Sequence, residues 1–142
     1  MKAAIALILD GAAHAAVRRV TLELHAEGGF GFSGVLLPAH ISLKQPFQIS
    51  NVAQVEAFFD TFASSLSPID LTLTSLEFWT IDDVIIGYLD VSDDRALRPL
   101  HERLNTALER EIGNTDAPFD GASYSISHVC GVPSHKHGER CE

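Results

Sequence analysis

The chain has 142 residues with 46% hydrophobic content, which is enough for one globular domain with a sizeable core. Its 10 lysines and arginines against 19 aspartates and glutamates leave a net charge of -9, which excludes a broad basic surface that coats nucleic acid but not a site for a small or terminal phosphate. Two cysteines are too few for a disulfide framework and predict a reducing, cytoplasmic setting, and no apolar run approaches the roughly 18 residues of a membrane span.

The first two predicted elements form a β-α unit. Ala3 to Leu9 is a short apolar run of strand length. From Ala12 the apolar spacing becomes helical, and Gly28-Gly29 ends the predicted helix. The helical face that we expect to be buried collects Ala13, Val17, Val20 and Leu24.

The next predicted strand runs over residues 35–47 and carries the motif HISLKQPF. Because side chains alternate along a strand, His40, Ser42 and Lys44 share one face, while the isoleucine and leucine between them supply packing on the other. A base, a hydroxyl donor and a cation side by side suit a phosphate better than a hydrocarbon core. Two alternatives stay open, namely a structural histidine at position 40 and a solvated edge lysine at position 44.

A second helix and a pair of strands follow. Asn51 with Gln54 resembles a capping box, and the helical pattern continues to Ser67-Pro68. The stripe that we expect in the core consists of Val52, Val55, Phe59, Phe62 and Leu66. Residues 69–91 are then predicted to form two antiparallel strands with a turn at Asp82-Asp83.

A third helix is predicted over residues 94–112, with Gly113 at its end. Its buried stripe consists of Leu97, Leu100, Leu104 and Leu108. Pro99 is tolerated only in a first turn, so the regular helix can also begin near Arg98. We expect His101 on this helix to lie at the surface or at the boundary of the core.

The last predicted elements are a loop over residues 114–121, a strand over residues 122–132 and a solvated tail over residues 133–142. The strand pattern, with period 2, places on one face Tyr124, Ile126, His128 and Cys130. Tyr124 is expected either to wall a substrate pocket or to pack. The folded domain is therefore predicted to span residues 1–132.

The order of these elements, together with the motif at His40, resembles the two-histidine phosphoesterases, the superfamily of the 2'-5' RNA ligases and 2',3'-cyclic phosphodiesterases. His40-Ile41-Ser42-Leu43 matches that family's H-x-[ST]-apolar motif. His128-Val129-Cys130-Gly131 stands where the second copy of the motif belongs, with a cysteine in place of the serine or threonine. The resemblance covers most of residues 1–132.

The resemblance implies an α+β fold in two pseudo-symmetric lobes, with mostly antiparallel sheets and flanking helices around a central cleft. It implies that His40 and His128 are the acid and base that hydrolyse a 2',3'-cyclic phosphodiester of a nucleotide or RNA end, without a metal or cofactor. Ser42, Cys130 and Lys44 would bind the phosphate, and Cys130 would do so less well because a thiol is a weak donor. Which histidine is the base stays open.

The C-terminus departs from the family pattern. Family members continue past the second motif with another helix and strand, whereas only residues 133–142 follow Val132, so we expect a shortened second lobe. An incomplete sheet leaves an unpaired edge beside His128, which invites either a homodimer or aggregation. The shortened lobe and Cys130 also leave open a weak or inactive phosphoesterase-like scaffold that binds a nucleotide or a partner.

A further alternative is zinc binding near the C-terminus. The candidate ligands are His128, Cys130, His135, His137 and Cys141. Sulfur together with imidazole suits zinc, but the spacing matches no zinc-finger pattern. The phosphoesterase hypothesis therefore assigns no metal.

Overall fold

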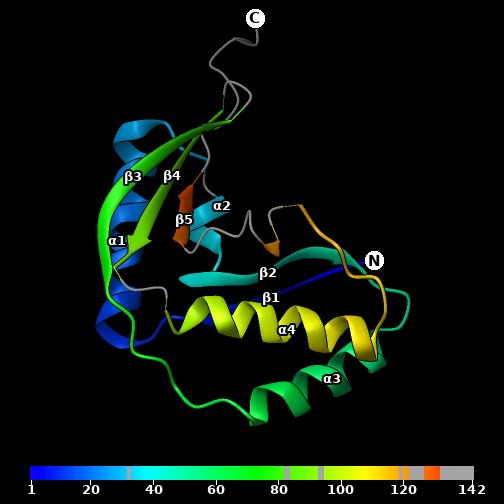
Figure 1. Ribbon diagram of the computed structural model, residues 1–142. Helices are drawn as coiled ribbons and strands as arrows, with labels where there is room; N and C mark the ends of the chain where they lie inside the picture. The colour runs from blue at the N-terminus through cyan, green and yellow to red at the C-terminus, as the bar shows by residue number, and fades with distance from the viewer. Residues whose placement is uncertain (32, 82–83, 93–94, 119, 122–126, 132–142) are drawn as a thin grey trace, which may run out of the picture. The chain divides into compact units, whose positions relative to one another are not determined.

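The computed structural model describes residues 1–31, 33–81, 84–92, 95–118, 120–121 and 127–131 (Figure 1). In chain order its elements are β1 (Lys2–Ile8), α1 (Gly11–Gly28), α2 (Ser33–Leu36), β2 (His40–Gln48), α3 (Val52–Ser64), β3 (Leu73–Ile81), β4 (Val84–Val91), α4 (Leu97–Glu111) and β5 (Ser127–Gly131). This mixture of helices with antiparallel strands confirms the predicted α+β class. Among the described helices, none is both long and apolar enough to cross a membrane.

The chain divides into two compact units. In their described residues, unit 1 comprises Met1–Leu7, Ser42–Thr72 and Ser92–Ile126, and unit 2 comprises Ile8–Ile41, Leu73–Val91 and Ser127–Glu142. The unit boundary crosses β2, so His40 belongs to unit 2 whereas Ser42 and Lys44 belong to unit 1.

Strands β1 and β2 form a two-stranded sheet, and the hydrogen bonds at its two ends show that it is antiparallel. At one end of the sheet the backbone N–H of Ile49 donates to the carbonyl of Met1, and at the other end that of Leu9 donates to Ala39, each at 2.9 Å. Pairing therefore begins at Ala39, directly after Pro38, which has no N–H for a ladder.

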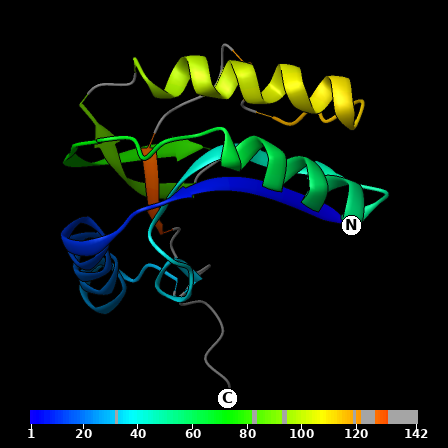
Figure 2. The same ribbon diagram turned by 90° about the horizontal axis from the view of Figure 1, so that it is seen from below.

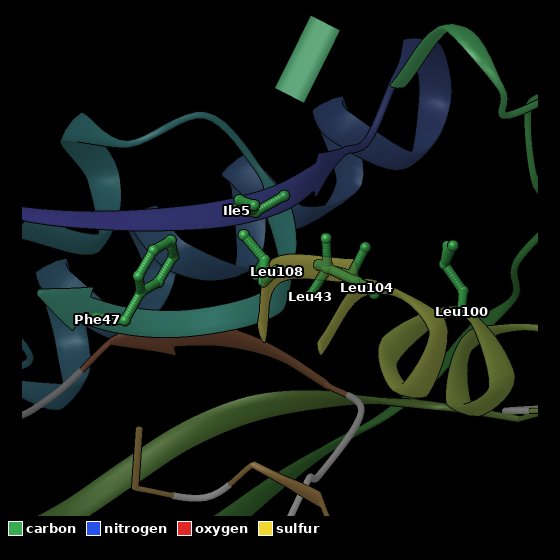
Figure 3. Packing of buried hydrophobic residues seen from close by; sticks show 6 residues of the cluster. All are labelled: Ile5, Leu43, Phe47, Leu100, Leu104 and Leu108. Carbon is green, nitrogen blue, oxygen red and sulfur yellow. The ribbon is translucent and has the colours of Figure 1, made fainter. Parts of the chain in front are cut away.

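The core of unit 1 lies between this sheet and α4, which runs alongside the two strands (Figure 2). Its buried side chains are Ile5, Leu43, Phe47, Leu100, Leu104 and Leu108, and Figure 3 shows them converging from β1, β2 and α4. Helix α3 adds Phe58 and Phe62, whose rings stack at 5.7 Å. The predicted leucine stripe of α4 is thus confirmed, and burial of side chains of this size stabilises a fold by roughly 1.5–3 kcal/mol each.

Helix α4 begins and ends as its sequence predicts. Pro99 lies in the first turn after Leu97, where a missing N–H costs no helical hydrogen bond. Gly113, with φ of +100°, donates its N–H to the carbonyls of Leu108 and Glu109 and closes the helix.

Unit 2 contains the antiparallel sheet β3-β4-β5 and the helices α1 and α2, both of which contact β5. The strand pair predicted over residues 69–91 is confirmed, with Trp79 opposite Ile86 in its register. The first strand begins later than predicted, at Leu73, because Ile69 packs instead against the core of unit 1. Val17, Ala39 and Leu89 are the buried centre of unit 2.

Some local predictions are wrong, among them the burial of Ala13 on α1, which is exposed. Val35 and Leu36 lie in the short helix α2 rather than at the start of the motif strand, and the carbonyl of Val35 accepts a hydrogen bond from Arg18 of α1. In the stripe predicted for α3, Val52 and Phe59 are 42% and 44% exposed and lie outside the core. Both Phe58 and Phe59 satisfy helical spacing from Val55, and packing against the core selects Phe58.

The predicted N-cap of α3 is confirmed, because the Asn51 side chain accepts a hydrogen bond from the backbone N–H of Gln54 at 3.2 Å. Asn51→Ala should lower the free energy of unfolding by about 1 kcal/mol, since the N–H then lacks its side-chain acceptor. Chemical denaturation measures this, with Asn51→Asp as a control that retains an acceptor. An unchanged denaturation midpoint in Asn51→Ala would mean that the cap contributes nothing.

Candidate active site

Over the first residues of β2, buried side chains alternate with half-buried ones, as the sequence predicts. Ile41 and Leu43 are buried, at 0% and 1% exposure, while His40 and Ser42 are half-buried. Two apolar anchors thus flank Ser42 and fix which side of the strand each polar group occupies. The assignment of His40 and Ser42 to catalysis and phosphate binding stays a prediction.

The imidazole of His40 is oriented by its own chain. Its Nδ1 lies 2.7 Å from the carbonyl oxygen of Pro38, and because a carbonyl only accepts, Nδ1 carries a proton and donates it. In this tautomer Nε2 is the ring nitrogen that carries the lone pair.

Lys44 is buried rather than solvated, with 2% of its side chain exposed. Its ammonium group forms an ion pair with Asp120, and it lies 5.6 Å from the centre of the Phe47 ring. The alternative of a solvated edge lysine is therefore wrong. The strand is covered on both faces here, with Leu43 against α4 and Lys44 against the end of the loop that follows α4.

The prediction that His101 lies at the surface or boundary is also wrong, because only 1% of the residue is exposed. Its Nδ1 lies 2.8 Å from the Leu43 carbonyl, and its Nε2 accepts the N–H of Gly121 at 3.1 Å. The sequence carried a signal for this burial, since position 101 shares the helical spacing of the leucine stripe. Asp120 and Gly121, by contrast, were predicted only as loop residues.

A cavity of about 820 Å³ in unit 1 lies beside these groups. Lys44, His101 and Asn105 line it, together with the carboxylates of Glu102, Glu109, Asp116 and Asp120. Among the described residues, three of these four carboxylates have no lysine or arginine partner, so the charge along the cavity disfavours a phosphate.

The second motif lies on β5, whose backbone is described. His128 stands opposite Leu89 of β4 in the antiparallel register, and Val129 opposite Tyr88. The structure does not describe the side chains of His128 and Cys130, and Tyr124 lies outside the described residues. Their predicted roles at the phosphate and in the substrate pocket therefore stay predictions.

The candidate zinc ligands at positions 128, 130, 135, 137 and 141 likewise fall where side chains are not described. In the part of the chain that is described, no group of three or more histidine, cysteine, aspartate or glutamate side chains is arranged to hold a metal ion.

Comparison with solved structures shows a shared fold. A structure of Usb1 from Kluyveromyces marxianus is similar with a TM-score of 0.52 and 13% identity, over 91% of this chain and 68% of that one. A second Usb1 structure from this yeast, with uridine monophosphate, has a TM-score of 0.47 and 14% identity, over 90% of this chain and 67% of that one. At such identities the likeness concerns the fold alone.

Comparison by sequence gives two results. No curated protein matches the chain. The family model of the 2'-5' RNA ligase superfamily matches residues 10–124, a stretch that includes the first histidine motif and the four helices. This match covers most of the chain, which therefore belongs to the 2'-5' RNA ligase superfamily.

Proposed function

We propose that this protein is a metal-independent phosphoesterase that hydrolyses a 2',3'-cyclic phosphodiester of a nucleotide or RNA end, with His40 and His128 as its acid and base. Membership of the 2'-5' RNA ligase superfamily supports an activity of the phosphoesterase type. Family membership does not by itself identify the substrate, the catalytic residues or the metal requirement. We add to it the cyclic substrate, catalysis by the two histidines and independence from a metal.

One observation in unit 2 carries the proposal. The backbone of His128 stands opposite Leu89, and Leu89 shares a buried core with Ala39, the residue directly before His40. The segments that bear the two motif histidines, far apart in sequence, are thus both neighbours of Leu89 in β4. This supports the idea that both imidazoles serve one phosphate.

The chemistry requires two proton transfers. One imidazole accepts a proton from water while the water oxygen attacks phosphorus, and the other protonates the ribose oxygen that leaves as the phosphorus–oxygen bond of the ring breaks. The product is a nucleoside monophosphate with a free neighbouring hydroxyl group. Imidazole suits both roles because it titrates near neutral pH. Ser42 would donate a hydrogen bond to a non-bridging oxygen, where negative charge grows in the transition state.

The proposal is tested by incubating the purified protein with 2',3'-cyclic nucleotides in the presence of EDTA and following the monophosphate product. The expected result is turnover that EDTA leaves unchanged, with no turnover of a 3',5'-cyclic nucleotide as the control substrate. Loss of turnover in EDTA would favour the zinc alternative. Nucleotide binding without turnover under either condition would favour the inactive scaffold.

A further inference from the structure

The end of the loop that follows α4 is bound to β2 at two consecutive positions. Lys44 forms the ion pair with Asp120, and Gly121 donates its N–H to Nε2 of His101. His101 in turn binds the carbonyl of Leu43 through Nδ1. Loop positions 120 and 121 are thus bound to strand positions 44 and 43, once directly and once through an imidazole. We call Lys44, His101, Asp120 and Gly121 the loop clamp.

The contacts of His101 determine where its proton lies. The Leu43 carbonyl only accepts, so Nδ1 donates, and the Gly121 amide only donates, so Nε2 accepts. The side-chain nitrogen of Asn105 donates to the His101 carbonyl at 3.1 Å and lies beside the ring, 3.0 Å from Nε2. Only the neutral ring with its proton on Nδ1 makes these bonds together, so the clamp uses one defined tautomer.

The ion pair of the clamp is buried but incompletely satisfied. The Lys44 and Asp120 side chains are 2% and 16% exposed, and Oδ1 of Asp120 is buried without a hydrogen-bond partner among the described residues. Desolvation of two charges offsets much of their attraction, so a buried pair contributes little net stability. What such a pair can provide is one preferred geometry, because removing either partner leaves an uncompensated charge.

Charge also opposes phosphate binding by Lys44. Asp120 already neutralises its ammonium group, and the adjoining cavity is lined by Glu102, Glu109 and Asp116. A phosphate would have to displace the Asp120 carboxylate from the buried ammonium group and then lie near three other carboxylates, and this like charge opposes its binding.

We propose that Lys44, Asp120 and His101 are positioning residues, which hold β2 at Leu43–Lys44 and so orient the hydroxyl of the adjacent Ser42, and that Lys44 does not bind the phosphate. The catalytic consequence rests on the proposed function. Loss of the clamp misplaces the Ser42 donor, whose bond to the phosphate oxygen matters most in the transition state, so kcat falls while KM changes little.

A double-mutant cycle separates positioning from phosphate binding. Lys44→Met and Asp120→Asn are each expected to lower kcat about tenfold with KM within about twofold, and the double variant should recover most of kcat because no unpaired charge remains. If Lys44 bound the phosphate, Lys44→Met would raise KM, Asp120→Asn would not lower kcat, and the double variant would be no better than Lys44→Met. That pattern would overturn the proposal.

Arg110→Met is the matched control, because it also removes a cation from an ion pair, but one that is exposed on α4, with 73% of Arg110 accessible. It should leave kcat and KM unchanged. Thermal unfolding of every variant shows whether it is folded at the assay temperature.

A second measurement does not need turnover. Hydrogen exchange at the Gly121 amide should accelerate at least about tenfold in Lys44→Met and stay unchanged in Arg110→Met, since the ion pair adjoins the Gly121–His101 bond. The nitrogen-15 shifts of the His101 ring in wild type should report a proton on Nδ1. Unchanged Gly121 exchange in Lys44→Met would contradict the clamp. If wild type shows no turnover, the proposed function fails, while exchange still decides whether the clamp holds the loop.

Discussion

His40→Ala is expected to lower kcat for a 2',3'-cyclic nucleotide by about 10²–10⁴-fold, the usual contribution of one general acid or base. The substitution should leave the fold intact, because His40 is half-buried and precedes the fully buried anchor Ile41. The measurement is steady-state hydrolysis by wild type and variant at equal concentration, with circular dichroism to verify folding.

The companion variant His128→Ala should lose activity to a similar extent. The double variant should lose little more than either single one, because an acid and a base that act in one step are not additive. His14→Ala is the control, since this half-buried histidine lies on α1 outside the candidate site. Activity that survives both His40→Ala and His128→Ala would refute the mechanism.

Leu104→Ala is expected to lower the free energy of unfolding by about 3 kcal/mol, within the range of about 2–5 kcal/mol for a buried leucine truncated to alanine. Leu104 has 0% exposure and lies among Leu43, Leu100 and Leu108 in the core of unit 1 (Figure 3). Truncation leaves a void there, because β2 and α4 are held in place by other side chains. Urea denaturation measures the change.

Leu22→Ala is the matched control for this core prediction. Leu22 is also a helical leucine, but 46% of it is exposed, so its truncation should cost well under 1 kcal/mol. Equal losses in the two variants would mean that the leucine stripe of α4 does not form the packed core described above.

Most elements were predictable because their signals are local. The spacing of Leu97, Leu100, Leu104 and Leu108 defines a helix face whatever the face packs against, and the Asn51 cap involves a residue only three positions away. Where two neighbouring residues satisfied the same spacing, as Phe58 and Phe59 do, only packing against the core could choose between them.

In the candidate site, too, some features follow from local sequence and others depend on tertiary packing. The alternation around His40 and Ser42 was predictable, because Ile41 and Leu43 are hydrophobic enough to fix the register. The helical spacing of His101 indicated which face of α4 it occupies, but not its hydrogen-bond partners, and a buried imidazole needs a partner for each of its two nitrogens. Those partners are Gly121 and Leu43, and the latter lies 58 positions away in the chain.

By itself the sequence determined the α+β order of elements and the apolar faces of β2 and α4, because residue periodicity specifies each of them. Only the tertiary structure decided the partner of Lys44. Asp120 stands 76 positions from it, and nothing in the local pattern of either segment brings them together. Burial explains why the partner matters. An exposed lysine is free to bind a phosphate, whereas a lysine removed from water needs a paired carboxylate to offset the loss of its hydration.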